Sequence, residues 1–342
     1  MDRQIDVSIK VIIRVVAVIL GLWFLYLVRD VVVLLFLAII LTATFDSPID
    51  WMAKHKIARP LGVFIIYIAL FLVIGCLVSF MIPPVINQAQ SFVQNLPAYS
   101  ESFAKTFTGV QQYAQSYGIQ FNSHDFLQNM LGNFSQSSGQ IFSTTVSVFT
   151  FFISVLVVLA LTFYMSVKED GMNKFLVSIT PNHNRQYVVS IANRIKNKIG
   201  NWFAGQLLLM LIIFVLDFTA LSFFHIPYAL VLALLAGLLE IVPYLGPIIS
   251  AILASLIGFL ISPVTGLIVL GILTIIQQLE SNVIVPQLMK KVVGLNPIVV
   301  ILALLIGAKL GGTLGAILAV PIATSINVVI EDLLERNEKR GM

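Results

Sequence analysis

Long apolar runs alternate with short polar loops along most of the chain. A helix needs about 20 apolar residues to cross the hydrocarbon core of a bilayer, and six runs come close to that length or exceed it. The first run is long for the apolar part of a secretion signal and lacks a small-residue cleavage site, so we interpret it as a retained span. The pattern predicts membrane-spanning helices at about 11–28, 31–46, 61–82, 141–167, 203–224 and 264–285.

Two further apolar stretches, 228–260 and 296–328, are each interrupted in the middle. The first is cut by Glu240-Ile-Val-Pro243-Tyr-Leu-Gly246-Pro247 and the second by Gly307-Ala-Lys309-Leu-Gly311-Gly312. Unbroken helices of about 33 residues would run ~50 Å, against a hydrocarbon core of ~30 Å. Backbone that leaves the helix at membrane depth needs protein or a water-filled cavity around it. We therefore predict two re-entrant helical hairpins that enter from opposite faces, a pattern typical of transporter binding sites.

Prolines and glycines at and near these interruptions are expected to shape the hairpins. Two prolines and a glycine within 243–247 remove or alter backbone hydrogen bonds that something else must replace. The glycines at 307, 311 and 315 have a four-residue spacing, which also permits close packing of two helices, and both explanations stay open. The hairpin-shaping candidates are Pro243, Gly246, Pro247, Pro286, Pro297, Gly307, Gly311 and Gly315.

Composition and the placement of charge support a membrane protein. The chain is 58% hydrophobic and only 11% charged, with a mean hydropathy of +0.99, whereas soluble domains carry about 25% charged residues. Lysine and arginine cluster in 51–60 and 168–200, while 83–140 contains only Lys105. Because basic loops stay in the cytoplasm, both termini are predicted to be cytoplasmic and 83–140 to lie outside. Lys290 and Lys291 then reach the cytoplasm only if 228–260 is a hairpin.

These segments predict an all-α polytopic membrane protein with about six full transmembrane helices and two hairpins. In 83–140, apolar residues such as Val85, Ala89 and Phe92 recur at helical spacing, which favours amphipathic helices over a linker. The predicted organisation is three N-terminal spans (1–82), this extracytoplasmic segment (83–140), a fourth span (141–167), a cytoplasmic helical loop (168–202), a transport core (203–328) and a cytoplasmic tail (329–342).

Several chemistries are excluded by what the chain lacks. It has no phosphate-binding loop, and a single cysteine, Cys76, allows no intramolecular disulfide. The four histidines are scattered, and no serine–histidine–aspartate set or paired glutamates suited to intramembrane hydrolysis is present. We therefore expect no enzyme activity, no cofactor, no bound metal and no nucleic-acid partner.

A small set of polar groups lies within the apolar segments. Asp217 lies inside 206–224, while Glu240 and Lys309 lie at the two interruptions. Charges at such depth cost a few kcal/mol, so they usually pair or face a cavity. Hairpin tips that reach the midplane would bring Glu240, Glu280 and Lys309 together. The structural alternatives are a Glu280–Lys309 ion pair, a helix cap at Glu240 and an interhelical hydrogen bond from Asp217. The candidates for solute or ion binding are Asp217, Glu240, Gln277, Glu280, Asn282 and Lys309.

Three strings resemble the signatures of a known family. They are Glu240-Ile-Val-Pro243-Tyr-Leu-Gly246-Pro247, then Gln277-Gln-Leu-Glu280-Ser-Asn282-Val-Ile-Val-Pro286 continuing to Val293-Gly294-Leu-Asn296-Pro297, and Gly307-Ala-Lys-Leu-Gly311-Gly-Thr-Leu-Gly315-Ala ending at Pro321. In this order and at these separations they are similar to the autoinducer-2 exporter-like permease family of bacterial membrane proteins. One departure is Asn296, where histidine is common in the family, and it argues against a proton-sensing role at that position.

The resemblance implies a secondary permease of the bacterial cytoplasmic membrane that assembles as a homo-oligomer. Members of the family are associated with export of autoinducer-2, and others with sodium/proton exchange. Our first hypothesis is therefore export of a small polar solute. In it, Gln277, Glu280 and Asn282 bind the solute or coupling ion, Glu240 carries a proton or orders the first tip, and Lys309 balances charge.

Two other hypotheses remain. In a Na⁺(Li⁺)/H⁺ antiporter, Asp217, Glu240 and Glu280 would take the cation and the proton alternately, which requires a carboxyl group that exchanges its proton near neutral pH. In a non-transporting membrane scaffold, the outside helices would bind a partner. The scaffold predicts that Glu280→Gln leaves function intact, whereas both transporters predict that it is damaging.

Overall fold

The computed structural model describes residues 9–116, 145–168, 177–178, 180–289 and 295–341, and this part of the chain is almost entirely helical. The elements are α1 (Ile9–Leu27), α2 (Arg29–Lys54), α3 (Arg59–Ser116), α5 (Thr145–Val167), η1 (Asn182–Asn184), α7 (Arg185–Phe223), α8 (Ala229–Leu239), α9 (Leu245–Ile261), α10 (Pro263–Leu279), the π-helical turn η2 (Glu280–Ile284), α11 (Val285–Met289) and α12 (Pro297–Gly341).

Several of these helices are long and apolar enough to cross a membrane. In the described part of the chain they number five: Arg29–Lys54, Arg59–Asn95, Asn182–Phe223, Pro263–Leu288 and Pro297–Arg336. The first four contain the predicted spans at 31–46, 61–82, 203–224 and 264–285. The fifth contains the second interrupted stretch, α1 covers the N-terminal predicted span, and α5 covers the described part of 141–167. The prediction of an all-α polytopic membrane protein is confirmed.

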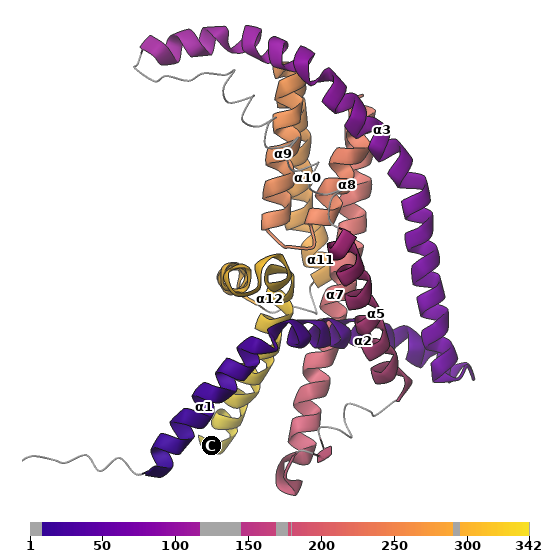
Figure 1. Cartoon of the computed structure of the whole chain (residues 1–342), viewed down its shortest axis with the longest axis vertical. Coiled ribbons are helices and arrows are strands. Elements are labelled where there is room, and N and C mark those ends of the chain that lie inside the picture. Colours follow the sequence, from indigo (N-terminus) through magenta and orange to yellow (C-terminus); the bar gives the residue numbers. More distant parts are fainter. Residues whose placement is uncertain (1–8, 117–144, 169–176, 179, 290–294, 342) are drawn as a thin grey trace, which may run out of the picture.

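Helices α7 to α10 form a bundle along the long axis of the molecule (Figure 1). Each helix returns along the one before it, and α2 crosses the bundle where Gly200 of α7 meets the backbone of Ala43. Lipid is as apolar as a leucine side chain, so membrane helices associate through close packing rather than through the hydrophobic effect. Small residues supply that packing here: a Cβ added to Gly258 would lie only 3.0 Å from the Cα of Gly266.

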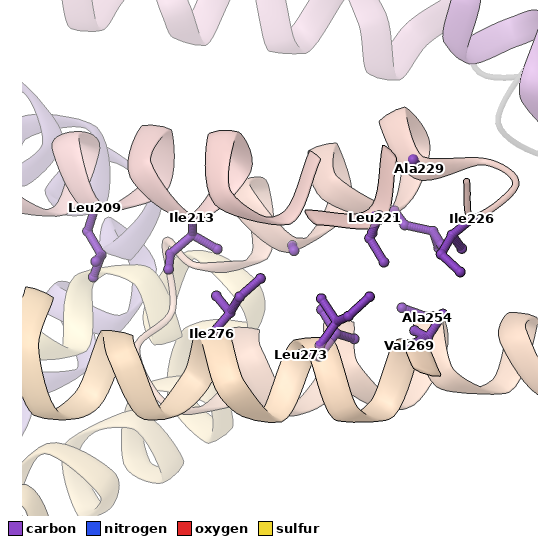
Figure 2. Packing of buried hydrophobic residues seen from close by; sticks show 12 residues of the cluster. Leu209, Ile213, Leu221, Ile226, Ala229, Ala254, Val269, Leu273 and Ile276 are labelled. Carbon is purple, nitrogen blue, oxygen red and sulfur yellow. The ribbon is translucent and has the colours of Figure 1, made fainter. Parts of the chain in front are cut away.

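The largest hydrophobic core among the described residues lies at the centre of the bundle and is built from α7, α8, α9 and α10. Figure 2 shows side chains of Leu209, Ile213 and Leu221 on α7 directed toward Leu273 and Ile276 on α10. The α7 residues recur at intervals of four, which places them on one helix face. Asp217 occupies the missing position of the same series. The apolar spacing of α7 therefore carries a carboxyl group into the interior.

The first interrupted stretch forms two helices joined by a tight turn. Helix α8 ends before Glu240, and α9 begins at Leu245. The turn satisfies its own backbone, because the N–H of Gly246 donates to the carbonyl of Val242 at 2.8 Å and that of Val242 donates to Leu239 at 3.1 Å. These bonds replace the ones that the prolines and the glycine disturb.

The second interrupted stretch is a bend inside α12, which changes direction in Figure 1. Helical geometry fails at Gly311 and at Gly312, whose φ of 60° favours glycine. Beyond the bend the chain folds back, so the backbones of Gly307 and Gly315 touch, and a Cβ on Gly307 would lie 3.0 Å from the Cβ of Ala319. Close packing thus accounts for Gly307 and Gly315, and the turn accounts for Gly312.

Two predicted boundaries lie inside continuous helices. Helix α3 passes through Pro83 and Pro84, where the sequence suggested a boundary between a span and an outside segment, and Figure 1 shows a long curved helix. Prolines lack the N–H of an interior turn and bend a helix without necessarily ending it. Helix α7 likewise runs through the predicted boundary at 202–203. The remainder of the outside segment, 117–140, and Lys290 and Lys291 lie outside the described residues.

The two ends of the bundle have different partners. The part of α3 between Gln88 and Tyr99 reaches the start of α8 and the end of α9. The hydroxyls of Tyr99 and Tyr228 are 2.9 Å apart, the N–H of Val231 donates to the side chain of Gln88 at 3.3 Å, and Leu260 of α9 packs on Tyr99. At the other end, ion pairs join the basic first half of α7 to other helices. They are Arg194–Asp332 and Lys198–Glu331, both at 3.1 Å, and Lys196–Asp46.

Candidate functional site

Three acidic side chains from different helices face one cavity inside the bundle. Asp217 comes from the C-terminal part of α7, Glu240 from the turn after α8, and Glu280 from the start of the π turn after α10. Their residues are 2%, 1% and 7% exposed. Charged residues are almost never buried to this degree without a partner, so the cluster is the strongest candidate for a functional site in the described chain.

The placement of each carboxyl group follows from local sequence. Asp217 continues the buried series of Ile213 on α7, and Glu280 follows Ile276 by four residues on α10. Glu240 lies where α8 ends, and the tight turn behind it depends on Gly246, since a Cβ there would meet the backbone of Leu239. Two helix faces and one turn therefore direct the three groups to the same point.

The cavity is small and has an acidic lining. Its volume is about 20 Å³, which is room for roughly one water-sized sphere. The lining residues are Ile213, Asp217, Glu240, Pro247, Ser250, Ala251, Leu273, Ile276, Gln277 and Glu280, with no lysine, arginine or histidine among them. The cavity as it stands therefore suits a water molecule or a small ion rather than an organic solute.

The negative charge at this site has little compensation within the described residues. Oδ1 of Asp217 and Oε2 of Glu240 are buried without a hydrogen-bond partner there, while Gln277 is a hydrogen-bond partner of Glu280. A buried carboxylate without partners costs several kcal/mol, so protons or a bound cation must neutralise part of the cluster. No three acidic, histidine or cysteine side chains of the described residues lie close enough together to hold a metal ion jointly. The arrangement therefore favours proton binding in this conformation.

The structure brings together four of the six predicted binding residues. Asp217, Glu240, Gln277 and Glu280 line the cavity. Asn282 does not; its amide nitrogen donates to the carbonyl oxygen of Gln278 at 3.0 Å and to the side-chain oxygen of Gln278 at 2.9 Å, on an exposed face.

Lys309 does not join the carboxyl groups. Its side chain is exposed and does not line the cavity, and no ion pair with Glu280 is present. The reason lies in α12, whose halves pack on Trp202 of α7 through Val300, Leu304, Ala319 and Val320. This packing places the bend of α12 away from the cavity.

The predicted hairpin-shaping residues have distinct surroundings. Pro247 lines the cavity, and Gly246 packs on Leu239. Pro297 is the first residue of α12, and the N–H of Ile298 next to it donates to the side chain of Asn296 at 2.9 Å. Pro243 lies in the turn between α8 and α9. The others lie within helices, with Pro286 in α11 and Gly307, Gly311 and Gly315 in α12.

Two buried polar residues at the site were not predicted. Gln206 of α7 is 1% exposed, and its Nε2 donates to the carbonyl oxygen of Glu240 at 2.5 Å. Ser250 lines the cavity, and its hydroxyl donates to the carbonyl of Pro247 at 3.0 Å. Gln206 lies on the helix face that also carries Ile213, so the apolar spacing of α7 could have identified it.

Substitution of Gln206 by leucine is expected to displace the turn that carries Glu240 and to lower stability. The change leaves the buried carbonyl oxygen of Glu240 without its donor, which costs about 1–3 kcal/mol. Thermal unfolding in detergent measures the loss. Thr219→Val is the matched control, since its exposed hydroxyl donates to the carbonyl of Val215 on its own helix. Equal melting temperatures for Gln206→Leu and the control would show that this hydrogen bond does not hold the turn in place.

The comparisons with known proteins identify the family. The chain matches the model "AI-2E family transporter" over residues 12–335. It is 30% identical over 288 residues to "Putative transport protein YueF" of Bacillus subtilis (strain 168), covering 81% of this chain and 77% of that protein. It is 26% identical over 313 residues to "Putative transport protein YrrI" of the same organism, covering 90% and 89%. A third relative, "Putative transport protein BpOF4_00890" of Alkalihalophilus pseudofirmus, is 24% identical over 328 residues, covering 91% and 83%.

The family match spans the interrupted helices and the acidic cavity together. It confirms the resemblance carried by the three strings around Glu240, Glu280 and Gly307. Together with several helices long enough to cross a membrane, it establishes a multi-pass membrane protein. The chain belongs to the AI-2E family of membrane transporters.

Proposed function

We propose that the chain is a proton-coupled secondary transporter in which Asp217, Glu240 and Glu280 carry the coupling proton. The observation that supports this function is a buried cavity lined by three carboxyl groups and by no basic side chain. A proton is the smallest charge that neutralises such a cluster, and a carboxyl group facing a cavity can release it when water enters from either side. Asp217 and Glu240 are the two most deeply buried of the three groups. They hold the proton while the cavity is closed to water on both sides.

The broken helices are the parts that would open the site. Helix α8 has 11 residues and α9 has 17, both shorter than the roughly 20 residues needed to span the hydrocarbon core. We infer that they form one re-entrant hairpin, and that the halves of α12 form a second from the opposite face. The base of the first lies against α3 near Tyr99, while the C-terminal half of α12 pairs with the basic end of α7. Residues 203–328 then form the transport core.

The positive charges support an orientation in the bacterial cytoplasmic membrane. Arg194, Lys196 and Lys198 gather at the end of the bundle opposite the outer half of α3. Basic residues near membrane spans remain in the cytoplasm. This end and both termini are therefore placed inside, and the far half of α3 outside. The homo-oligomer implied by the family resemblance stays a prediction.

The size of the cavity favours a small cation over an organic solute as the species exchanged for protons. A volume of about 20 Å³ excludes a sugar-sized molecule from this conformation, so export of a small polar solute would require a much wider cavity in another state. A bare Na⁺ or Li⁺ is small enough for such a cavity, although the carboxyl groups would have to move closer together to hold it jointly. We therefore place Na⁺(Li⁺)/H⁺ exchange first and export of a small polar solute second.

Proton flux in proteoliposomes tests the proposal. Purified protein is reconstituted with a pH-sensitive dye inside, and internal pH is followed after a jump in external Na⁺, Li⁺ or K⁺. Exchange predicts a pH change with Na⁺ or Li⁺ that is lost in Glu280→Gln. No pH change from intact, oriented protein would exclude cation/proton exchange. Normal function in Glu280→Gln, with loss on deletion of 90–130, would instead support the scaffold.

A further inference from the structure

The helix that carries Glu280 changes its winding at that residue. Helix α10 is regular up to Leu279, and the next turn is a π turn in which the N–H of Val285 donates to the carbonyl oxygen of Glu280. Such turns are rare, occur singly inside α helices and are frequent at functional sites. Here the π turn begins at a residue that lines the acidic cavity.

Pro286 explains why the turn forms at this place. A proline inside an α helix has no N–H to give, and its ring collides with the carbonyl of the residue four positions earlier, which here is Asn282. A wider turn relieves that collision. Two side chains cover carbonyl groups of the preceding turn: the hydroxyl of Ser281 donates to Gln277 at 2.8 Å, and the amide of Asn282 donates to Gln278 at 3.0 Å.

The π turn lets the helical segments before and after it, α10 and α11, pack on the same core. Ile276 of α10 and Leu288 of α11 both contact the core around α7, yet they are twelve positions apart. In a regular α helix such residues point about 120° apart, and the extra residue taken up by a π turn reduces this to about 20°. With a regular turn, either α11 would leave the core or the residues before it would shift by one position.

That one-position shift has a defined consequence at the site. Glu280 would move to the place now held by Leu279, whose side chain is 45% exposed, and Ser281 would take its place in the cavity. Two exposed amides, Gln278 and Asn282, lie on the same stretch of helix. Polar side chains on an apolar span are costly against lipid, which indicates that the helix meets water or protein here. A carboxylate that leaves the cavity on this stretch would reach polar surroundings.

We propose that the π turn is a register switch: it holds Glu280 in the cavity, and its conversion to an α turn carries Glu280 out to the exposed position of Leu279 while Ser281 replaces it. The inference rests on the proposed transport function and assigns to Pro286 and Ser281 the role of positioning residues. Proton release then takes place at a surface that Asp217 and Glu240 do not reach.

Thiol labelling tests the switch independently of transport. In a Cys76→Ala background, Ser281→Cys exposes a thiol in the π register and buries it in the α register. Adding Pro286→Ala removes the ring collision and favours the α turn, so labelling by a water-soluble maleimide is expected to slow by roughly tenfold or more, as for any thiol that becomes inaccessible. Glu335→Cys, exposed on α12 outside the helix that shifts, is the control and is expected not to change. Unchanged labelling of Ser281→Cys would overturn the switch.

A one-residue deletion tests whether transport needs the switch. Removing Val283, an exposed residue of the π turn, leaves a regular helix that keeps both packing faces and holds Glu280 in the cavity. The variant is expected to fold, to elute as wild type and to lose flux, while Val283→Ala transports normally. Wild-type flux in the folded deletion variant would overturn the inference. Absence of flux in wild-type protein would instead count against the proposed function, and the labelling result would still decide the register.

Discussion

Replacing Glu240 by glutamine is expected to reduce cation-driven proton flux to the level of protein-free liposomes. Glu240 is the most buried of the three acids, and one of its oxygens has no hydrogen-bond partner among the described residues. Glutamine keeps the shape of the side chain and cannot accept or release a proton. The variant should therefore remain folded and lose the exchange step. Internal pH after a Na⁺ or Li⁺ jump measures the loss.

The melting temperature of Glu240→Gln distinguishes a proton-carrying role of Glu240 from a purely structural one. Glutamine removes an ionisable group from an apolar interior, so the melting temperature of Glu240→Gln is expected to equal or exceed that of the wild type. A group held only as a helix cap would instead lower it. Glu335→Gln is the matched control, because Glu335 is exposed on α12 far along the chain from the cavity lining. Wild-type flux in Glu240→Gln would exclude this residue as a proton carrier.

Substitution of Gly246 by alanine is expected to open the turn between α8 and α9. The added Cβ would collide with the peptide group that joins Leu239 to Glu240, and would lie 2.9 Å from the backbone nitrogen of Glu240. Backbone cannot move aside as a flexible side chain does, so the cost lies at or above the ~1–3 kcal/mol typical of an overpacked core. Because Glu240 begins the same turn, flux should fall together with stability.

Thermal unfolding in detergent measures the effect on stability. A loss of this size is expected to lower the melting temperature by about 5 °C in a protein of this length. Gly271→Ala is the control: Gly271 lies on α10 of the same bundle, with no atom within 4 Å of an added Cβ. Equal melting temperatures for the two variants would show that the turn tolerates a side chain and that Gly246 is not required for its geometry.

Local patterns were sufficient to predict most of the helices. Apolar runs, and the prolines and glycines that interrupt them, placed the breaks at 240–247 and 307–312, where the structure has a turn and a bend. The predicted boundaries at 82–83 and 202–203 fall within the continuous helices α3 and α7, because a proline pair can bend a helix without ending it. The π turn was missed since one Pro286 in a span is compatible with a kink, an end or a wider turn.

Only part of the candidate site could be predicted from the sequence, and the reason is physical. Asp217, Glu240 and Glu280 were chosen because charge at membrane depth requires a partner or a cavity, and they do share one cavity. Lys309 met the same criterion and lies elsewhere. Gln206 was missed although it lies on the buried face of α7, because the pattern of apolar residues does not show that its side chain donates to the backbone of Glu240.

The sequence by itself determined that this is a polytopic helical membrane protein, that two helices are broken, and which family it belongs to. These properties follow from neighbouring residues, since every backbone group in lipid must be satisfied within its own segment. Only the tertiary structure decided which polar groups meet. Asp217 and Glu280 come together because α7 and α10 pack through Ile213 and Ile276, and that register depends on contacts between distant parts of the chain.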